Sequence, residues 1–126
     1  MLASAELVAF VPVTDLGQAR NFYESILGIP CVDASGIACV FDCGGTTLRA
    51  TLVEGHKAPT HTVVGWAVGD LPATVQCLAD RGVVMERFPG IEQDDRGIWT
   101  TPGGDQVVWF KDFDGNILSV TQPAGR

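Results

Sequence analysis

The sequence predicts an α+β fold made of two similar halves, each with one strand, one helix and about three further strands. One observation is an internal repeat: "ELVAFVPVTDLGQARNFYESILGI" and "TVVGWAVGDLPATVQCLADRGV" superpose when Val8 is placed on Val63. A second is a pair of hairpins, "ACVFDCGGTTLRATL" and "VWFKDFDGNILSVTQ", which superpose when Gly45 is placed on Gly115. Repetition of this kind is the signature of a repeated structural unit.

The first half opens with a strand over residues 7–13, where apolar side chains alternate between two faces. Pro12 places this strand at a sheet edge or at a bulge, because proline cannot donate a ladder hydrogen bond. Asp15 is the expected N-cap of the following helix, and Gly28 its left-handed stop. The apolar stripe of this helix comprises Leu16, Ala19, Phe22, Tyr23 and Ile26, with Tyr23 expected at the edge.

The second half repeats this pattern with a strand over residues 63–68 and a helix capped by Asp70. Pro72 suits the first helical turn and Gly82 ends the helix. Leu71, Val75 and Leu78 are expected to face inward.

Each half then continues with a hairpin whose turn contains Asp and Gly. The placement of Gly45 on Gly115 also puts Asp42 on Asp112 and Arg49 on Ser119. Before the last hairpin lies a long segment rich in Gly, Pro and Asp, "FPGIEQDDRGIWTTPGGDQ". A loop of this length inside a compact domain is usually functional or mobile.

The composition of the chain restricts its partners and its compartment. The chain has 126 residues and a formal net charge of -7, with only 8 Lys and Arg residues. This argues against nucleic acid and anionic membranes as partners, since both bind clustered basic residues. No long apolar run and no signal-peptide pattern occur, so we expect a cytoplasmic protein. The cysteines are then expected to be free, buried thiols rather than disulfides or zinc ligands: Cys31, Cys39, Cys43 and Cys77.

The βαβββ repeat, the passage "VTDLGQARNFYESILGI" and the ending "FKDFDGNILSVTQ" resemble the vicinal oxygen chelate superfamily. That superfamily includes glyoxalase I, extradiol dioxygenases, fosfomycin-resistance enzymes and bleomycin-binding proteins. The resemblance runs from about Glu6 to Gln122. It implies a single domain over residues 1–126, with module one at about 5–56 and module two at about 61–122. It further implies two mixed sheets that curl into a cup with the helices packed outside, and a homodimer in which modules are sometimes swapped.

The resemblance also locates the metal-binding positions of the superfamily's metal-dependent members. A His or Gln lies seven residues before each capping Asp, and a Glu four residues after the Gly of each final hairpin. In this chain those positions hold Val8, Val63, Arg49 and Ser119. Two valines, a cation and a neutral hydroxyl are poor ligands for a divalent metal, so we expect neither metal nor other cofactor.

A relocated metal site is an alternative. His61 shares the strand parity of Val63, and the long loop offers Glu92, Asp94 and Asp95 as carboxylate ligands. The competing interpretation is that His61 and His56 are solvated linker residues.

The residues at the cup positions predict a pocket for a small molecule. Val8, Phe10, Val63 and Ile117 would form an apolar lining with the hydroxyl of Ser119, and Arg49 would be a lone cation. Such a lining suits a small or aromatic ligand with a carboxylate, because guanidinium binds carboxylates through two parallel hydrogen bonds. Alternatively, Arg49 pairs with an acidic neighbour or points to solvent.

The tryptophans differ in their expected roles. Trp66 shares the parity of the face that packs on the helix, so we expect it in the core. Trp99 lies in the long loop, where it forms either a pocket wall or a lid. Trp109 and Phe110 alternate along one strand, so one of them faces the cup, and the sequence does not decide which.

Three functions follow from these observations. The first is a metal-free protein that binds a small, anionic or aromatic molecule, like the bleomycin-binding members. The second is a glyoxalase-like lyase, isomerase or epimerase with a relocated or absent metal site. The third is a module that acts through protein contacts. Nucleophilic catalysis has little support, because Ser119 has no histidine at a motif spacing and no nucleophile elbow occurs.

Overall fold

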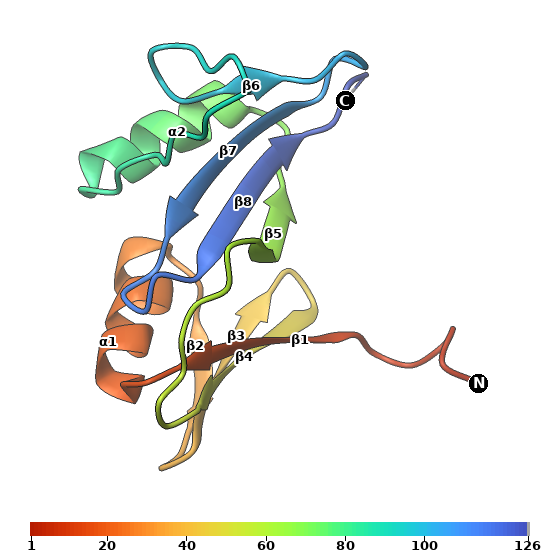
Figure 1. Ribbon diagram of the computed structural model, residues 1–126. Coiled ribbons are helices and arrows are strands. Elements are labelled where there is room, and N and C mark those ends of the chain that lie inside the picture. The colour runs from red at the N-terminus through yellow and green to blue at the C-terminus, as the bar shows by residue number, and fades with distance from the viewer. Residues whose placement is uncertain (126) are drawn as a thin grey trace. The chain divides into compact units, whose positions relative to one another are not determined.

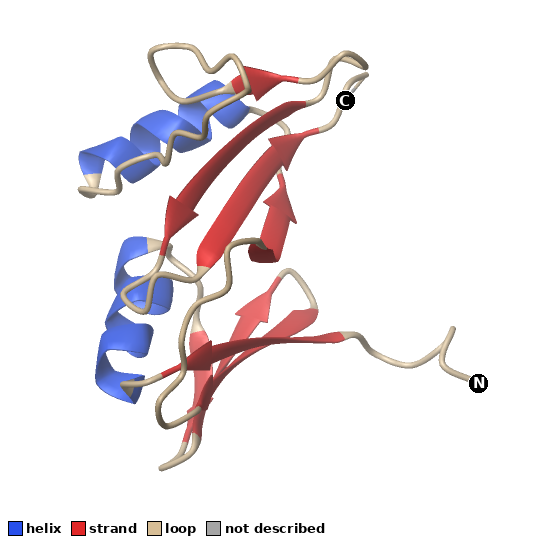
Figure 2. Cartoon of the chain, viewed as in Figure 1, coloured by secondary structure: helices blue, strands red, loops and turns tan. Residues whose placement is uncertain are grey.

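The computed structural model describes residues 1–125 and has the α+β fold class predicted from the sequence (Figure 1). The chain divides into two compact units, one comprising residues 1–57 and the other beginning at Ala58. Each unit contains one mixed four-stranded sheet and one helical segment, in the order strand, helix and three strands (Figure 2). The predicted βαβββ repeat is therefore confirmed.

The first unit forms a sheet in the order β1-β4-β3-β2. Strands β1 and β4 are parallel, and the other neighbours are antiparallel. Strand β1 lies at an edge, as Pro12 predicts. The elements are β1 (Val8–Val13), α1 (Leu16–Arg20), a π-helical continuation η1 (Asn21–Ile26), β2 (Cys31–Ala34), β3 (Ala38–Cys43) and β4 (Thr46–Leu52).

Local signals in the sequence fix both ends of the first helix. The side chain of Asp15 accepts a hydrogen bond from the backbone N–H of Gln18 at 2.9 Å, as an N-cap residue does. Gly28 has φ of 77°, and its N–H donates to the carbonyl of Glu24 at 3.1 Å. This left-handed conformation ends the helix at low cost because glycine has no Cβ.

Tyr23 is fully buried, so the prediction that it lies at the helix edge is wrong. Its ring contacts Phe22 edge to face at 5.2 Å between centroids and Phe41 at 5.6 Å. The error arises because Tyr23 lies in the π-helical segment, where the 3.6-residue period used for the prediction does not hold. The remaining core of this unit is the sheet face under α1, made by Val11, Val13, Cys39, Phe41, Leu48 and Ala50.

The second unit forms a sheet in the order β5-β8-β7-β6, again with one parallel pair, β5 and β8. Its helix is capped by Asp70, whose carboxylate accepts a hydrogen bond from the N–H of Ala73 at 3.1 Å. Gln122 also accepts a hydrogen bond from the N–H of Leu71 at 2.8 Å, which ties the last strand to the start of the helix. The elements are β5 (Thr62–Ala67), α2 (Leu71–Asp80), β6 (Trp99–Thr100), β7 (Gln106–Lys111) and β8 (Ile117–Gln122).

The helix-facing side of the second sheet resolves the choice between Trp109 and Phe110. Phe110 is 1% exposed and belongs to the core, so Trp109 lies on the opposite face of β7. Trp66 shares the core face by register but is only partly buried, so the expectation of a core position holds only in part. The other core residues are Leu71, Val75, Leu78, Val108, Leu118 and Val120.

The strand registers of the two units match on the parallel pairs. Phe10 is paired with Arg49, and Gly65 with Ser119, which are the positions that the sequence repeat superposes. The hairpins match less well, because the first turn has two residues, 44–45, and the second has five, 112–116. Lys111, rather than Asp112, is therefore the structural counterpart of Asp42.

All four cysteines are free thiols. Cys39 is buried as predicted, Cys31 and Cys43 are partly buried, and Cys77 is exposed, so the expectation of burial is wrong for Cys77. Within residues 1–125, no helix has both the length and the apolar character needed to cross a membrane.

Candidate functional site

The open face of the second sheet, opposite α2, carries the strongest candidate site. Trp109 on β7 is paired with Ser119 on β8, and both lie on the face that does not carry Phe110. Side chains of directly paired residues lie side by side on one face of a sheet. Ile117 belongs to the same face, two residues from Ser119 on β8.

A pocket of about 250 Å³ lies on this face. Its walls are aromatic and aliphatic, formed by Phe88, Trp99, Trp109, Ile91 and Ile117. Its polar groups come from three consecutive residues at the start of β5, Thr60, His61 and Thr62. We call this hollow the aromatic pocket. An apolar lining with a few polar groups on one side is typical of sites for small molecules.

The rings of the aromatic pocket are arranged around Trp109. The Trp99 ring is stacked with Trp109 at 6.0 Å between centroids and an interplanar angle of 26°. Phe88 meets Trp109 edge to face at 5.4 Å and 89°. These contacts fix the ring planes, because each such pair contributes about 0.5–1.5 kcal/mol beyond simple burial. The result is a preformed aromatic surface on which a planar group can stack.

Gln93 holds the segment that supplies Phe88. Its side-chain oxygen accepts from the N–H of Phe88 at 2.8 Å, and its amide nitrogen donates to the carbonyls of Glu86 and Gly97, each at 2.9 Å. The N–H of Glu86 donates in turn to the carbonyl of Trp109 at 2.7 Å. The Gln93 side chain thus supplies hydrogen bonds to a segment that has few backbone–backbone hydrogen bonds.

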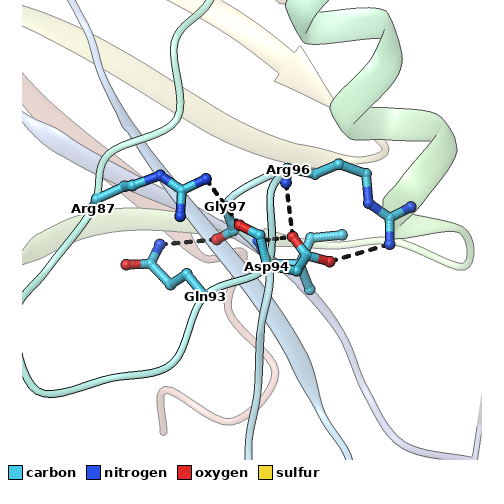
Figure 3. Close-up of polar contacts among 6 residues, drawn as sticks. Arg87, Gln93, Asp94, Arg96 and Gly97 are labelled. Atoms are coloured by element: carbon cyan, nitrogen blue, oxygen red, sulfur yellow. Dashed lines mark hydrogen bonds and ion pairs between the residues drawn. The ribbon is translucent and has the colours of Figure 1, made fainter.

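Asp94 stabilises the same segment through a second set of hydrogen bonds (Figure 3). Its Oδ1 accepts from the N–H groups of Arg96 and Ile98, both at 2.9 Å, and its Oδ2 accepts from Nη2 of Arg96 at 3.1 Å. Its backbone carbonyl accepts from Nη2 of Arg87 at 2.8 Å. Burial alone would raise the pKa of Asp94, but the hydrogen bonds from Ile98 and Arg96 outweigh it, so the pKa lies below its ordinary value.

The relocated metal site is not assembled in this structure. Asp94 uses its carboxylate oxygens on Arg96 and the backbone, while His61 lines the aromatic pocket. Glu92 and Asp94 line a separate, more polar hollow of about 510 Å³, whose lining also includes Trp99. Across residues 1–125, no group of three His, Cys, Asp or Glu side chains is placed to hold a metal ion.

The metal positions implied by the resemblance do not fit a metal either. Val8 and Val63 have no lone pairs to donate, and Arg49 carries a fixed positive charge. Ser119 offers only a neutral hydroxyl. It lies beside the aromatic pocket rather than among the residues that line it. A Cβ placed on Gly65 would meet Ser119 Oγ at 2.6 Å, so Gly65 provides the space for this side chain.

Val63 is displaced from the position that the sequence repeat assigns to it. A bulge lies between Thr62 and Val64, so Thr62 is the partner of Ile117. Val8 is paired with Thr47, the counterpart of Ile117, which makes Thr62 rather than Val63 the equivalent of Val8. A bulge inserts one unpaired residue, and no sequence signal marks this one.

The open face of the first sheet holds the other predicted site residues. Val8 is 41% exposed and Phe10 is 59% exposed. Arg49 is partly buried and lies between its partners Phe10 and Val40. Within residues 1–57, no carboxylate forms an ion pair with Arg49. Asp42, an acidic residue on the same face, accepts from the N–H of Gly45 at 3.1 Å.

Sequence reasoning located Trp99, Trp109 and Ile117 but missed the residues that enclose them. Phe88 and Ile91 come from the long loop, and their signal was the presence of two large apolar residues in a segment otherwise rich in Gly, Pro and Asp. Thr60 and Thr62 carry no comparable signal, because threonine beside a strand is ordinary.

The chain belongs to the Glyoxalase/Bleomycin resistance protein/Dioxygenase superfamily, whose profile matches residues 6–120. A comparison with curated proteins gave no match.

Solved structures share the fold at low sequence identity. One is a superfamily member from Sphaerobacter thermophilus, at 20% identity and a TM-score of 0.74, covering 98% of this chain and 100% of that one. Another is a superfamily member from Alicyclobacillus acidocaldarius, at 15% identity and a TM-score of 0.73, covering 96% of this chain and 92% of that one. A third is the fosfomycin resistance protein FosX from Listeria monocytogenes, at 13% identity and a TM-score of 0.72, covering 97% of this chain and 95% of that one.

Proposed function

We propose that this superfamily member is a metal-independent binding protein for a small molecule with a planar aromatic group. The observation that carries the proposal is the aromatic pocket, in which Trp99, Trp109 and Phe88 present fixed ring surfaces. Aromatic side chains lose little rotamer entropy on binding and bury large areas, so they dominate the energetics of such sites. Metal independence is supported by the chemistry of the superfamily's ligand positions, which hold Val8, Arg49, Ser119 and, by strand register, Thr62 instead of Val63.

We propose separately that Arg49, on the open face of the first sheet, recognises the anionic group of a small molecule. A partly buried cation without a counter-ion in its own unit is an energetically unfavourable arrangement that a carboxylate relieves. Phe10 and Val40 flank it with apolar surface. The aromatic pocket and Arg49 are tested separately, because each belongs to a different unit.

Three probes with one ring system separate ring recognition from charge recognition. They are 2-naphthol, 2-naphthoate and 2-naphthylmethylammonium, which are neutral, anionic and cationic. Binding is measured by calorimetry and by thermal shift in the presence of EDTA, since a ligand that binds only the folded state raises its stability. We expect all three to bind the aromatic pocket, and only 2-naphthoate to bind in addition at Arg49.

Trp66 offers a matched control for Trp109, because it lies on the opposite face of its sheet. Trp109→Leu should weaken all three probes by about three- to tenfold, the worth of one aromatic contact, whereas Trp66→Leu should leave affinity unchanged. Equal losses in the two variants would contradict the aromatic pocket as the site. Binding of the probes that requires added Zn, Ni, Mn or Fe(II) would contradict metal independence.

A further inference from the structure

Two cysteines of the first unit lie on the same face of neighbouring strands. Cys31 on β2 is paired with Phe41, and Cys39 is two residues before Phe41 on β3. Residues two apart on a strand share a face, so Cys31 and Cys39 are diagonal neighbours. The face is the one under α1, where the Cys39 thiol donates to the carbonyl of Leu16 at 3.9 Å.

Cys31 and Cys39 lie close enough to influence each other electrostatically. Each thiol donates its proton to a backbone carbonyl, Cys31 to that of Asp33 at 3.4 Å and Cys39 to that of Leu16 at 3.9 Å. Burial raises the pKa of the Cys39 thiol, and Cys31 raises it further. Cys39 is buried while Cys31 is partly exposed, so the pair is open to solvent on one side.

Arg20 is linked to Cys31 through the carboxylate of Glu24. Arg20 donates from Nε to Glu24 Oε1 at 3.1 Å, and Glu24 Oε2 accepts from the N–H of Cys31 at 2.8 Å. The pKa of Arg20 is raised first by its hydrogen bond to Glu24 and then by its proximity to Cys31. The guanidinium of Arg20 also lowers the pKa of Cys39, whereas Glu24 raises it, so the groups facing the pair are one cation and one carboxylate.

We propose that Cys31 and Cys39 form a two-thiolate site for a univalent soft metal ion with the chemistry of Cu(I). Thiolates select soft ions, and two of them suffice for a univalent ion that accepts two-coordination. Zinc would need four ligands, and within residues 1–125 no third His, Cys, Asp or Glu joins a pair of this kind. The site is independent of the function proposed above.

The binding step balances without an oxidant or a reductant. Both thiols lose a proton to solvent, each sulfur donates one electron pair to Cu(I), and the product carries a net charge of -1. Arg20 then faces an anion rather than two neutral thiols, which stabilises the bound form electrostatically.

The test is an anaerobic titration of the reduced protein with Cu(I) supplied as its bathocuproine disulfonate complex. Transfer is followed by loss of the complex's absorbance and by the number of thiols left reactive. We expect one Cu(I) per chain and loss of two reactive thiols. Cys31→Ser should weaken binding by more than about 100-fold, since changes that only misorient a ligand already cost up to that amount.

The other two cysteines provide the control. A Cys43→Ser/Cys77→Ser variant keeps the pair and should bind Cu(I) as the parent does. Thermal unfolding of Cys31→Ser shows whether the variant is folded, and its partly exposed position favours this. The proposal is overturned if folded Cys31→Ser binds as tightly as the parent, if the control variant loses the site, or if the pair forms a disulfide instead of retaining copper.

Discussion

The open faces of the two sheets have the same strand pairing but differ in the residues that cover them. In each unit a parallel strand pair places equivalent positions side by side, Phe10 with Arg49 in the first and Gly65 with Ser119 in the second. In the first unit only residues 27–30 separate η1 from β2, whereas in the second unit residues 81–98 separate α2 from β6. That longer segment supplies Phe88 and Ile91, which enclose the aromatic pocket.

The comparison shows that the repeat supplies the scaffold and the insertion supplies the pocket. Phe10 is 59% exposed on the first face, whereas Phe88 meets Trp109 edge to face at 5.4 Å on the second. The first face offers a cation with no ion pair within residues 1–57 beside an exposed ring, while the second offers stacked rings with hydroxyl groups at one side. The variants below separate these roles.

The largest expected effect on stability distinguishes the two faces of β7. Phe110→Ala should lower the free energy of unfolding by about 3–5 kcal/mol, because it empties a fully packed core position. Trp109→Ala, one residue earlier, should cost less stability and more ligand affinity, since Trp109 is partly exposed. Urea unfolding of both variants measures the difference. Similar losses of stability would mean that Trp109 is a core residue.

The next effect tests the close approach of the Ser119 side chain to Gly65. The counterpart of Gly65 in the first unit is Phe10. Gly65→Ala should cost about 1 kcal/mol, at the low end for overpacking, because the Ser119 hydroxyl can rotate away. Ser119→Ala in the same chain should remove most of this cost. Phe10→Ala is the matched change in the first unit and should alter stability by less than about 0.5 kcal/mol. A Gly65→Ala cost that persists without the Ser119 hydroxyl would contradict the contact.

Arg49 should influence charge recognition alone. Arg49→Ala should weaken the binding of 2-naphthoate at the first sheet by about tenfold or more, the worth of a charge-assisted hydrogen bond, and leave 2-naphthol unchanged. Calorimetric titration of both probes measures the ratio. Arg49→Lys keeps the charge but loses the bidentate geometry, so it should fall between the parent and Arg49→Ala. Unchanged binding of 2-naphthoate in both variants would remove Arg49 from the site.

The smallest effect concerns the insertion itself. The pKa of Asp94 is lowered in the folded protein from an ordinary value of 3.8, so its carboxylate stabilises the segment above that pH. This contribution should be lost as the pH falls through the folded pKa. Hydrogen exchange of the Ile98 and Arg96 amides should show weaker protection below about pH 4. In Asp94→Asn, protection should be weaker at every pH and lack this transition. Because Asp94 is 38% exposed, salt should reduce the effect.

Much of the scaffold was predictable because it depends on local signals. Asp15 and Asp70 cap their helices, Gly28 ends the first one, and the repeat pairs Arg49 with Ser119. Each of these features requires only a few neighbouring residues. The fold class and the helix positions followed from them.

The features that escaped prediction depend on long-range packing or register. Tyr23 is buried by a π-helical turn, and Val63 is displaced by a bulge, neither of which has a distinct residue pattern. The aromatic pocket needs Phe88, which reaches Trp109 only because the Gln93 side chain fixes the loop. Alternation on β7 required one of Trp109 and Phe110 to face the site, and only the packing of the core decided which.

The most direct test of the aromatic pocket uses the indole N–H signals of the chain's three tryptophans. These signals are recorded by ¹⁵N NMR while 2-naphthol or 2-naphthoate is added in the presence of EDTA. The account predicts saturable shifts of the Trp99 and Trp109 signals, with the Trp66 signal unmoved. Shifts confined to Trp66, shifts that appear only when a divalent metal replaces EDTA, or no shift with either probe would contradict a metal-independent aromatic site.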